Sequence, residues 1–319
     1  MSASGFHARR GRPANRDSLR STPLGAIWDG LPWRDQQLLL WLQSADIVTA
    51  SLAALLVYGP LRTAQRRLAR LSELGILRAF WASSAYRPRG RHAFVLRRGA
   101  RLDLERLVWP EGRRGRAPEI PSSAATHQLA THDLFAAFLR AGDPSREEGI
   151  FAWVPERAAA RLFDGYLRPD AVAGIRVGER VIVLFVERDL GTERGNDLPD
   201  KIARYRAVFA RAPELALHVG FVVESARRAR TIHGLVSAGH RIDSGLRILT
   251  ALDAELRSDP LGVTWSDDEV SATTRHLTPL ATGASWPILR PGCLAEPDVL
   301  DALDERAVGM FAAVRAYLG

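Results

Sequence analysis

The feature of this sequence that most restricts its fold is a pair of apolar segments joined by a short turn. Residues 171–177 and 180–186 lie on either side of Gly178-Glu179, and the second segment becomes a continuous apolar run over residues 181–186. This pattern predicts a β-hairpin that continues into a buried strand. The surrounding sequence predicts helices over residues 127–139, 155–162, 200–210 and 227–237, and strands over residues 151–154, 217–223 and 246–249. Together these elements predict an α/β (α+β) sandwich with a mixed sheet.

The N-terminal third predicts a different arrangement. Pro32 opens a helix that runs to residue 43, Thr49 is the expected N-cap of a short helix over residues 50–57, and a longer helix begins at Pro60 and ends at Gly75. Two short apolar segments then flank an arginine-rich tip over residues 86–91, which predicts a hairpin. Helix, short helix, long helix and basic hairpin resemble a winged helix-turn-helix, in which the third helix enters the major groove of DNA.

The third predicted helix has an arginine-rich face opposite its apolar stripe. Its apolar residues recur at spacings of three and four, so the polar residues between them are expected to face outward. Arginine and threonine side chains contact base edges and phosphates, and the hairpin tip is basic too. The alternatives are a solvated helix face or a surface for protein contacts. The candidate DNA-binding residues are Arg62, Thr63, Arg66, Arg67, Arg70, Arg87, Arg89 and Arg91.

The charge distribution also separates the N-terminal third from the rest. Residues 1–120 contain 21 arginines and 9 acidic residues, whereas the remainder contains 23 basic and 27 acidic residues. A basic N-terminal third joined to a mildly acidic body indicates that the basic part binds a polyanion. Of the 44 basic residues only Lys201 is a lysine. Either a lysine remains here by chance in a chain with a strong bias toward arginine, or this position requires a compact ammonium group.

Composition divides the chain into five segments and excludes several classes of protein. Cys293 is the only cysteine, which excludes an internal disulfide and a cysteine-based zinc site. No apolar run is long enough for a membrane span, so we expect a cytoplasmic protein. The expected segments are a disordered basic arm (1–25), the winged helix-turn-helix (26–109), a linker (110–124), the α/β domain (125–265) and a C-terminal extension with a terminal helix (266–319).

Acidic residues are expected to gather where the hairpin strands of the α/β domain meet. Asp170 precedes the first strand, Glu187 ends the second, and Asp189 follows two residues later. Clustered carboxylates repel one another unless they share a cation or a proton, and such pairs commonly hold Mg²⁺ for phosphodiester chemistry. Lys201 and Tyr205 share a helix face one element later. Further candidates are Glu193, which caps the next segment or joins the cluster, Asp133 and Glu156, while His127 is expected to cap a helix.

This arrangement resembles the core of the restriction-endonuclease-like, or PD-(D/E)xK, nucleases. Arg168-Pro-Asp170 followed by Glu187-Arg-Asp189 matches the two acidic positions, which implies that Asp170 and Glu187 hold the metal, with Mg²⁺ as the cofactor if the site is active. The family places a lysine two residues after the second acid, where this chain has Asp189. Lys201 would therefore act from the following helix, or the domain has lost its activity.

A second resemblance covers most of residues 30–265. The predicted winged helix is followed by His127-Gln-Leu-Ala-Thr-His-Asp133, Arg168-Pro-Asp-Ala171, Phe185-Val-Glu-Arg-Asp-Leu-Gly-Thr-Glu193 and Lys201-Ile-Ala-Arg-Tyr205. This order is similar to the replication-relaxation family of plasmids and other mobile elements. The resemblance implies double-stranded DNA as the partner more firmly than it implies a reaction.

Three functions remain open at this point. The first is a non-catalytic DNA-binding replication or regulatory factor with a degenerate nuclease fold. The second is a metal-dependent nuclease or nickase that the winged helix targets to DNA. The third is an assembly factor that uses the winged helix to bind replication or transfer proteins. The apolar positions of the predicted terminal helix suit docking either onto the body of the protein or onto a second copy, so a homodimer is one expectation.

Overall fold

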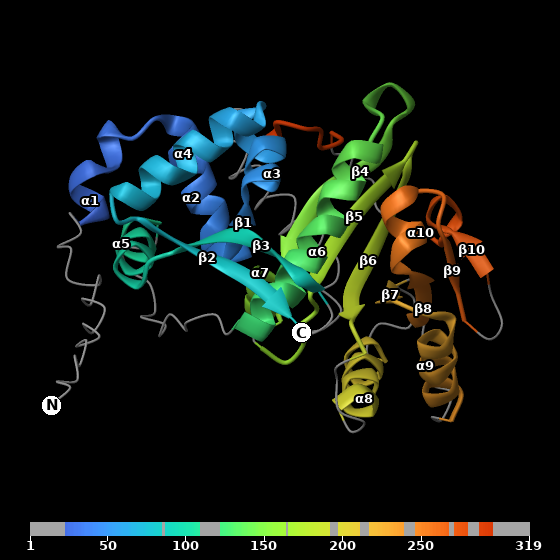
Figure 1. Cartoon of the computed structure of the whole chain (residues 1–319). Coiled ribbons are helices and arrows are strands. Elements are labelled where there is room, and N and C mark those ends of the chain that lie inside the picture. Colours follow the sequence, from blue (N-terminus) through green and yellow to red (C-terminus); the bar gives the residue numbers. More distant parts are fainter. Residues whose placement is uncertain are drawn as a thin grey trace, which may run out of the picture.

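The computed structural model of this 319-residue chain describes residues 23–84, 87–108, 122–163, 165–191, 197–210, 217–238, 246–267, 271–279 and 287–295. Within these ranges the protein is a mixed α/β molecule with a three-stranded and a seven-stranded sheet. We call residues 23–108 the N-terminal unit and residues 122–295 the second unit, and Figure 1 shows them side by side. The described helices include none that is long and apolar enough to cross a membrane.

Helices form most of the N-terminal unit. The Thr49 hydroxyl accepts a hydrogen bond from the Leu52 amide at 3.2 Å, which confirms the predicted N-cap. The chain leaves the long helix through Gly75, whose φ of 75° favours glycine. The helices are α1 (Leu24–Ile27), α2 (Trp33–Ala45), α3 (Ala50–Ala53) with its π-helical continuation η3 (Ala54–Tyr58), α4 (Leu61–Glu73) and α5 (Arg98–Val108).

A small antiparallel sheet completes the N-terminal unit. The predicted hairpin is present as β2 (Leu77–Ser84) and β3 (Arg87–Leu96). A third strand, β1 (Ile47–Thr49), pairs with β3 on the other side, giving the order β1-β3-β2. The sequence does not indicate β1, because three residues are too few to show a period-two pattern.

The seven-stranded sheet forms the centre of the second unit. The predicted hairpin is present, and its second strand extends three residues beyond the expected end, so Glu187 and Asp189 lie within it. The sheet order is β10-β9-β8-β7-β6-β5-β4, with β6, β7 and β8 mutually parallel. The strands are β4 (Glu148–Pro155), β5 (Ala171–Val177), β6 (Arg180–Asp189), β7 (Leu217–Val223), β8 (Leu246–Leu252), β9 (Thr264–Ser266) and β10 (Ser271–Thr273).

Helices cover both faces of this sheet, as the continuous apolar run in β6 requires. On one face Leu184 and Val186 pack with Phe135 and Phe138 of the long helix α6. On the other face alternate strand residues such as Phe185 pack with α8 and α9. The helices of this unit are α6 (Ser122–Ala141), α7 (Glu156–Leu162), α8 (Asp197–Phe209), α9 (Ala226–Ala238) and α10 (Asp253–Ser258).

The two units share one hydrophobic core. A continuous cluster of buried residues runs from Leu38 and Leu56 in the N-terminal unit to Leu134 and Trp153 in the second. Residues 287–295 connect the units again, since the Leu289 amide donates to Ile150 and the Gly292 amide donates to Leu55, both at 2.7 Å. The helix predicted over residues 297–318 lies outside the described residues.

Candidate functional site

The structure brings Asp170 and Glu187 together at one end of the β5–β6 hairpin. Ala171 pairs with Val186 in the antiparallel register, so the residues just beyond this pair are neighbours across the hairpin. The Arg188 amide donates a hydrogen bond to Asp170 Oδ2 at 2.6 Å, which fixes the Asp170 carboxylate against β6. Glu187 is almost fully buried, with an exposed fraction of 1%.

Helix α8 supplies two donors to Glu187. The Lys201 Nζ lies 3.0 Å from Oε2, and the Tyr205 hydroxyl donates to Oε1 at 2.5 Å. Residues four apart lie on one helix face, so Lys201 and Tyr205 reach the same carboxylate. Leu198 and Ile202 pack on the sheet beside Tyr205, and this burial holds the helix in position.

Helix α6 supplies a further residue of the site, His127. His127 was expected to cap a helix, but α6 begins at Ser122, so His127 lies inside the helix. Its Nε2 lies 2.8 Å from Asp170 Oδ1. Its spacing along the sequence gave no signal for this contact, because a single histidine 43 residues before its partner forms no recognisable pattern.

Burial and charge separate the two carboxyl groups chemically. Burial raises the pKa of Glu187 to about 7, although the charge of Lys201 acts in the opposite direction. Burial also acts to raise the pKa of Asp170, but the hydrogen bond and charge of His127 outweigh it, and the pKa of Asp170 is lowered. The same pairing raises the pKa of His127 against the effect of burial. Burial therefore opposes ionisation of Glu187, whereas the pairing with His127 favours the ionised form of Asp170.

Two nearby acidic residues have separate environments. Glu156, the first residue of α7, has a pKa raised by burial and then by the charge of Asp170, and it lies 3.4 Å from an Arg168 nitrogen. Asp189 pairs with Arg228 of α9 at 2.8 Å and accepts the Gly191 amide at 2.6 Å. Among its described contacts Asp189 does not join the other two carboxylates.

The described residues do not fit a magnesium ion as they stand. Each carboxylate oxygen of Asp170 and Glu187 already accepts from, or pairs with, a group of the chain itself. A hard cation in a protein usually takes several oxygen ligands. Within the described ranges no three His, Cys, Asp or Glu side chains are grouped so as to hold a metal ion, and Glu193, the remaining predicted candidate, lies outside those ranges.

The predicted arginine-rich face is present in part on α4. Arg62, Arg66 and Arg70 are exposed and Thr63 is half-buried. The expectation that Arg67 faces outward is wrong. Its Nε donates to the fully buried Asp35 of α2 at 3.1 Å, and a second guanidinium nitrogen pairs with the same carboxylate. A buried carboxylate needs a compensating charge, and this requirement draws Arg67 inward.

Among the three arginines predicted at the hairpin tip, the structure describes the side chain of Arg91. The Arg91 guanidinium forms a two-pronged ion pair with Asp133 of α6, at 2.7 and 2.9 Å. The side chains of Arg87 and Arg89 lie outside the described residues. Arg91 therefore contacts the second unit, and no sequence pattern indicates this contact.

The fold and this cluster together define a class: a mixed α/β protein with paired acids, a lysine and a histidine gathered where a hairpin meets two helices. The sequence model of the replication-relaxation family matches residues 39–222, more than half of the chain, and the chain belongs to this family. The matched range includes α4 and all four residues of the cluster. No curated protein and no solved structure matches the chain.

Proposed function

We propose that this protein binds double-stranded DNA and acts in the replication or relaxation of a plasmid or other mobile element. The family supports the setting. The arginine row on α4 is the observation that supports DNA binding. Its members, Arg62, Arg66 and Arg70, recur every four residues and are exposed. Such a row presents several cations along one helix face, which suits contact with a phosphate backbone and with base edges.

In this proposal the chain has the domain organisation expected from its sequence. Residues 26–109 act as a winged helix-turn-helix, with α4 in the major groove and the β2–β3 hairpin against the backbone. Residues 125–265 act as a restriction-endonuclease-like domain that has lost its activity. The internal pairing of Asp170 with His127 and of Glu187 with Lys201 and Tyr205 supports a structural role for the acids. Replication or transfer proteins and a second copy of the chain are further candidate partners.

Electrophoretic mobility shift with a random-sequence duplex tests the proposal. Wild type is expected to shift the duplex at low salt, and the triple variant Arg62→Ala, Arg66→Ala, Arg70→Ala is expected to lose most of that affinity. Arg146→Ala, an exposed arginine of the second unit, is the control and should bind like wild type. Absence of a shift at low salt, or a triple variant that binds normally, would contradict DNA binding and favour the assembly factor.

A second candidate function is a metal-dependent DNA nuclease or nickase. The convergence of Lys201 with Glu187 favours it, because the only lysine of the chain reaches the acidic pair from α8. Supercoiled and linear DNA are incubated with the protein and Mg²⁺ or Mn²⁺. Nicking that depends on the metal and is lost in Asp170→Asn and Glu187→Gln would replace the non-catalytic proposal. Intact DNA, with unchanged affinity in both variants, would exclude the nuclease.

A further inference from the structure

A cavity of about 360 Å³ opens at the junction of the two units. Its lining residues include none of the acidic cluster, by which we mean Asp170 and Glu187 with their partners His127, Lys201 and Tyr205. Its lining comes from α3 and the end of β1, from β3, from α6 and from α10. Leu52, Leu129 and Ala137 supply apolar walls, and Thr49 and Ser51 supply hydroxyl groups. A volume of this size suits a small ligand or one group of a larger one.

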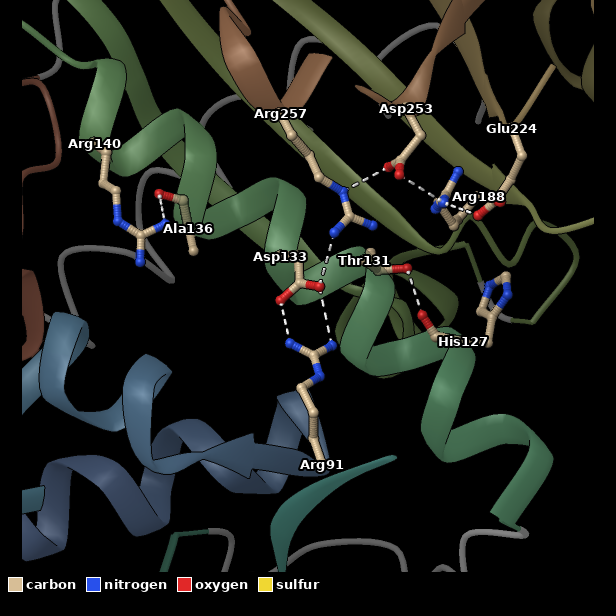
Figure 2. A network of polar contacts seen from close by, with 10 residues as sticks. All are labelled: Arg91, His127, Thr131, Asp133, Ala136, Arg140, Arg188, Glu224, Asp253 and Arg257. Atoms are coloured by element: carbon tan, nitrogen blue, oxygen red, sulfur yellow. Dashed lines mark hydrogen bonds and ion pairs between the residues drawn. The ribbon is translucent and has the colours of Figure 1, made fainter. Parts of the chain in front are cut away.

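Three arginines from three different elements line this cavity: Arg91 of β3, Arg140 of α6 and Arg257 of α10. Figure 2 shows Arg91 and Arg257 approaching Asp133 from opposite sides, with Arg140 two turns further along the same helix. Asp133 and Arg140 are seven residues apart, so they lie on one face of α6. The cavity thus collects cations from both units.

The positive charge in the cavity exceeds the negative charge. Asp133 is the only acidic residue among the described lining residues, and it pairs with Arg91 and, at 3.2 Å, with Arg257. Arg257 also pairs, through its Nε at 2.9 Å, with Asp253 of its own helix, outside the lining. Arg140 is exposed, and its guanidinium donates to the Ala136 carbonyl of its own helix at 3.4 Å. Arg257 Nη2 is buried and has no hydrogen-bond partner among the described residues. Three arginines therefore face two aspartates, and among the described contacts Arg140 is the cationic group that has no carboxylate partner.

We propose that this junction cavity binds a phosphate group, held by Arg140 and Arg257 and completed by Arg91 and the Ser51 hydroxyl. A phosphate carries several acceptor oxygens and a negative charge, and the planar guanidinium fork matches that geometry. The Thr49 hydroxyl accepts from the Leu52 amide and still has its own hydrogen to donate. The phosphate belongs either to the DNA backbone or to a free phosphate or nucleotide, and only the DNA source rests on the function proposed above.

Thermal unfolding of the full chain with inorganic phosphate tests the cavity without any DNA. At constant ionic strength made up with chloride, phosphate is expected to raise the unfolding temperature of wild type in a concentration-dependent way. Arg140→Met should weaken the apparent phosphate affinity about tenfold, because a charge-assisted hydrogen bond is lost. Arg146→Met, another exposed arginine, should respond like wild type. Asp133→Asn should bind phosphate more tightly, because it removes the carboxylate that competes for Arg91 and Arg257.

A second measurement identifies the source of the phosphate. If Arg140→Met also weakens binding to a DNA duplex and lowers its salt dependence, the cavity takes a backbone phosphate. If duplex affinity is unchanged while the phosphate response is lost, the cavity takes a free phosphate group. The proposal is overturned if phosphate does not stabilise wild type, or if Arg140→Met responds to phosphate as wild type does. These two overturning results come from phosphate stabilisation alone, so they do not depend on whether α4 binds DNA.

Discussion

Individual side chains control the acidic cluster because its two carboxyl groups are buried. Glu187 depends on Lys201 and Tyr205 for its hydrogen bonds, and Asp170 depends on His127 and the Arg188 amide. A buried charge that loses its partner is strongly unfavourable. Lys201 also keeps an exposed fraction of 21% in its side chain, so part of its charge remains hydrated. A compact ammonium therefore suits this position beside the Glu187 carboxylate.

Replacing Lys201 with methionine should lower the free energy of unfolding by about 2 kcal/mol, because Glu187 loses a charged hydrogen-bond donor. Lys201→Arg should recover little of the loss, because the planar guanidinium does not fit where the compact ammonium lies. Urea unfolding at neutral pH measures both effects. Asp200→Ala, at the exposed preceding position, is the control and should be neutral. A Lys201→Met protein as stable as wild type would contradict this account of the cluster.

The wrong expectations for His127 and Arg67 have one physical cause in common. His127 and Arg67 each contact a carboxylate far away in the chain, Asp170 and Asp35 respectively. Helix periodicity gives the face on which a residue lies, but it carries no information about a buried charge on another element. By contrast, the meeting of Asp170 with Glu187 follows directly from the hairpin register, which the short turn and apolar alternation define.

At the scale of elements, Asp35 joins three helical segments. Its carboxylate, fully buried in α2, accepts from the Tyr58 hydroxyl of η3 at 2.7 Å and pairs with Arg67 of α4. Burial and the negative charge of Asp35 raise the pKa of Tyr58, so the phenol stays protonated as a donor. These contacts fix the orientation of α4, whose opposite face carries the exposed arginines.

Asp35→Ala should lower the free energy of unfolding by about 3 kcal/mol, since it leaves a partly buried guanidinium and a buried hydroxyl without their acceptor. Denaturant unfolding followed by tryptophan fluorescence reports this loss. Asp29→Ala, an exposed aspartate just before α2, serves as the matched control. Equal stability of the two variants would show that the Asp35 contacts do not hold the helices together.

Elements with a strong local pattern could be predicted from the sequence, and short ones could not. Strands β4 to β8 and helices α2, α4 and α6 to α9 coincide with predicted segments, with boundaries that differ by up to five residues, whereas the eleven-residue helix α5 was not predicted. The three-residue strands β1, β9 and β10 depend on tertiary pairing and have no pattern of their own. Helix α10 was missed because its six residues follow directly on β8 without a break in the sequence.

At the scale of the whole molecule, α6 joins the two units. His132 of α6 is buried, and its ring lies 5.2 Å from that of Trp41 in α2. Asp133 next to it holds Arg91 of β3. The junction is therefore polar as well as apolar, and its arrangement is sensitive to protonation.

Acid should weaken this junction through His132. Burial lowers the pKa of His132 from 6.5 to about 4. Between these two values the imidazole is protonated in the unfolded chain but neutral in the folded protein, so a fall in pH through this range favours unfolding. The stability of wild type should fall by about 2 kcal/mol more than that of His132→Leu between pH 7 and pH 5. Urea unfolding of both proteins at the two pH values measures the difference. Parallel losses in the two proteins would contradict the assignment to His132.

The salt dependence of duplex binding by Arg66→Ala tests the central claim most directly. Fluorescence anisotropy gives the logarithm of the association constant against the logarithm of salt concentration for wild type, Arg66→Ala and the control Arg146→Ala. If α4 lies on DNA, the slope for Arg66→Ala should be smaller than that of wild type by about one unit, with the control unchanged. An Arg66→Ala protein with the affinity and slope of wild type would contradict the proposal that this arginine row binds DNA.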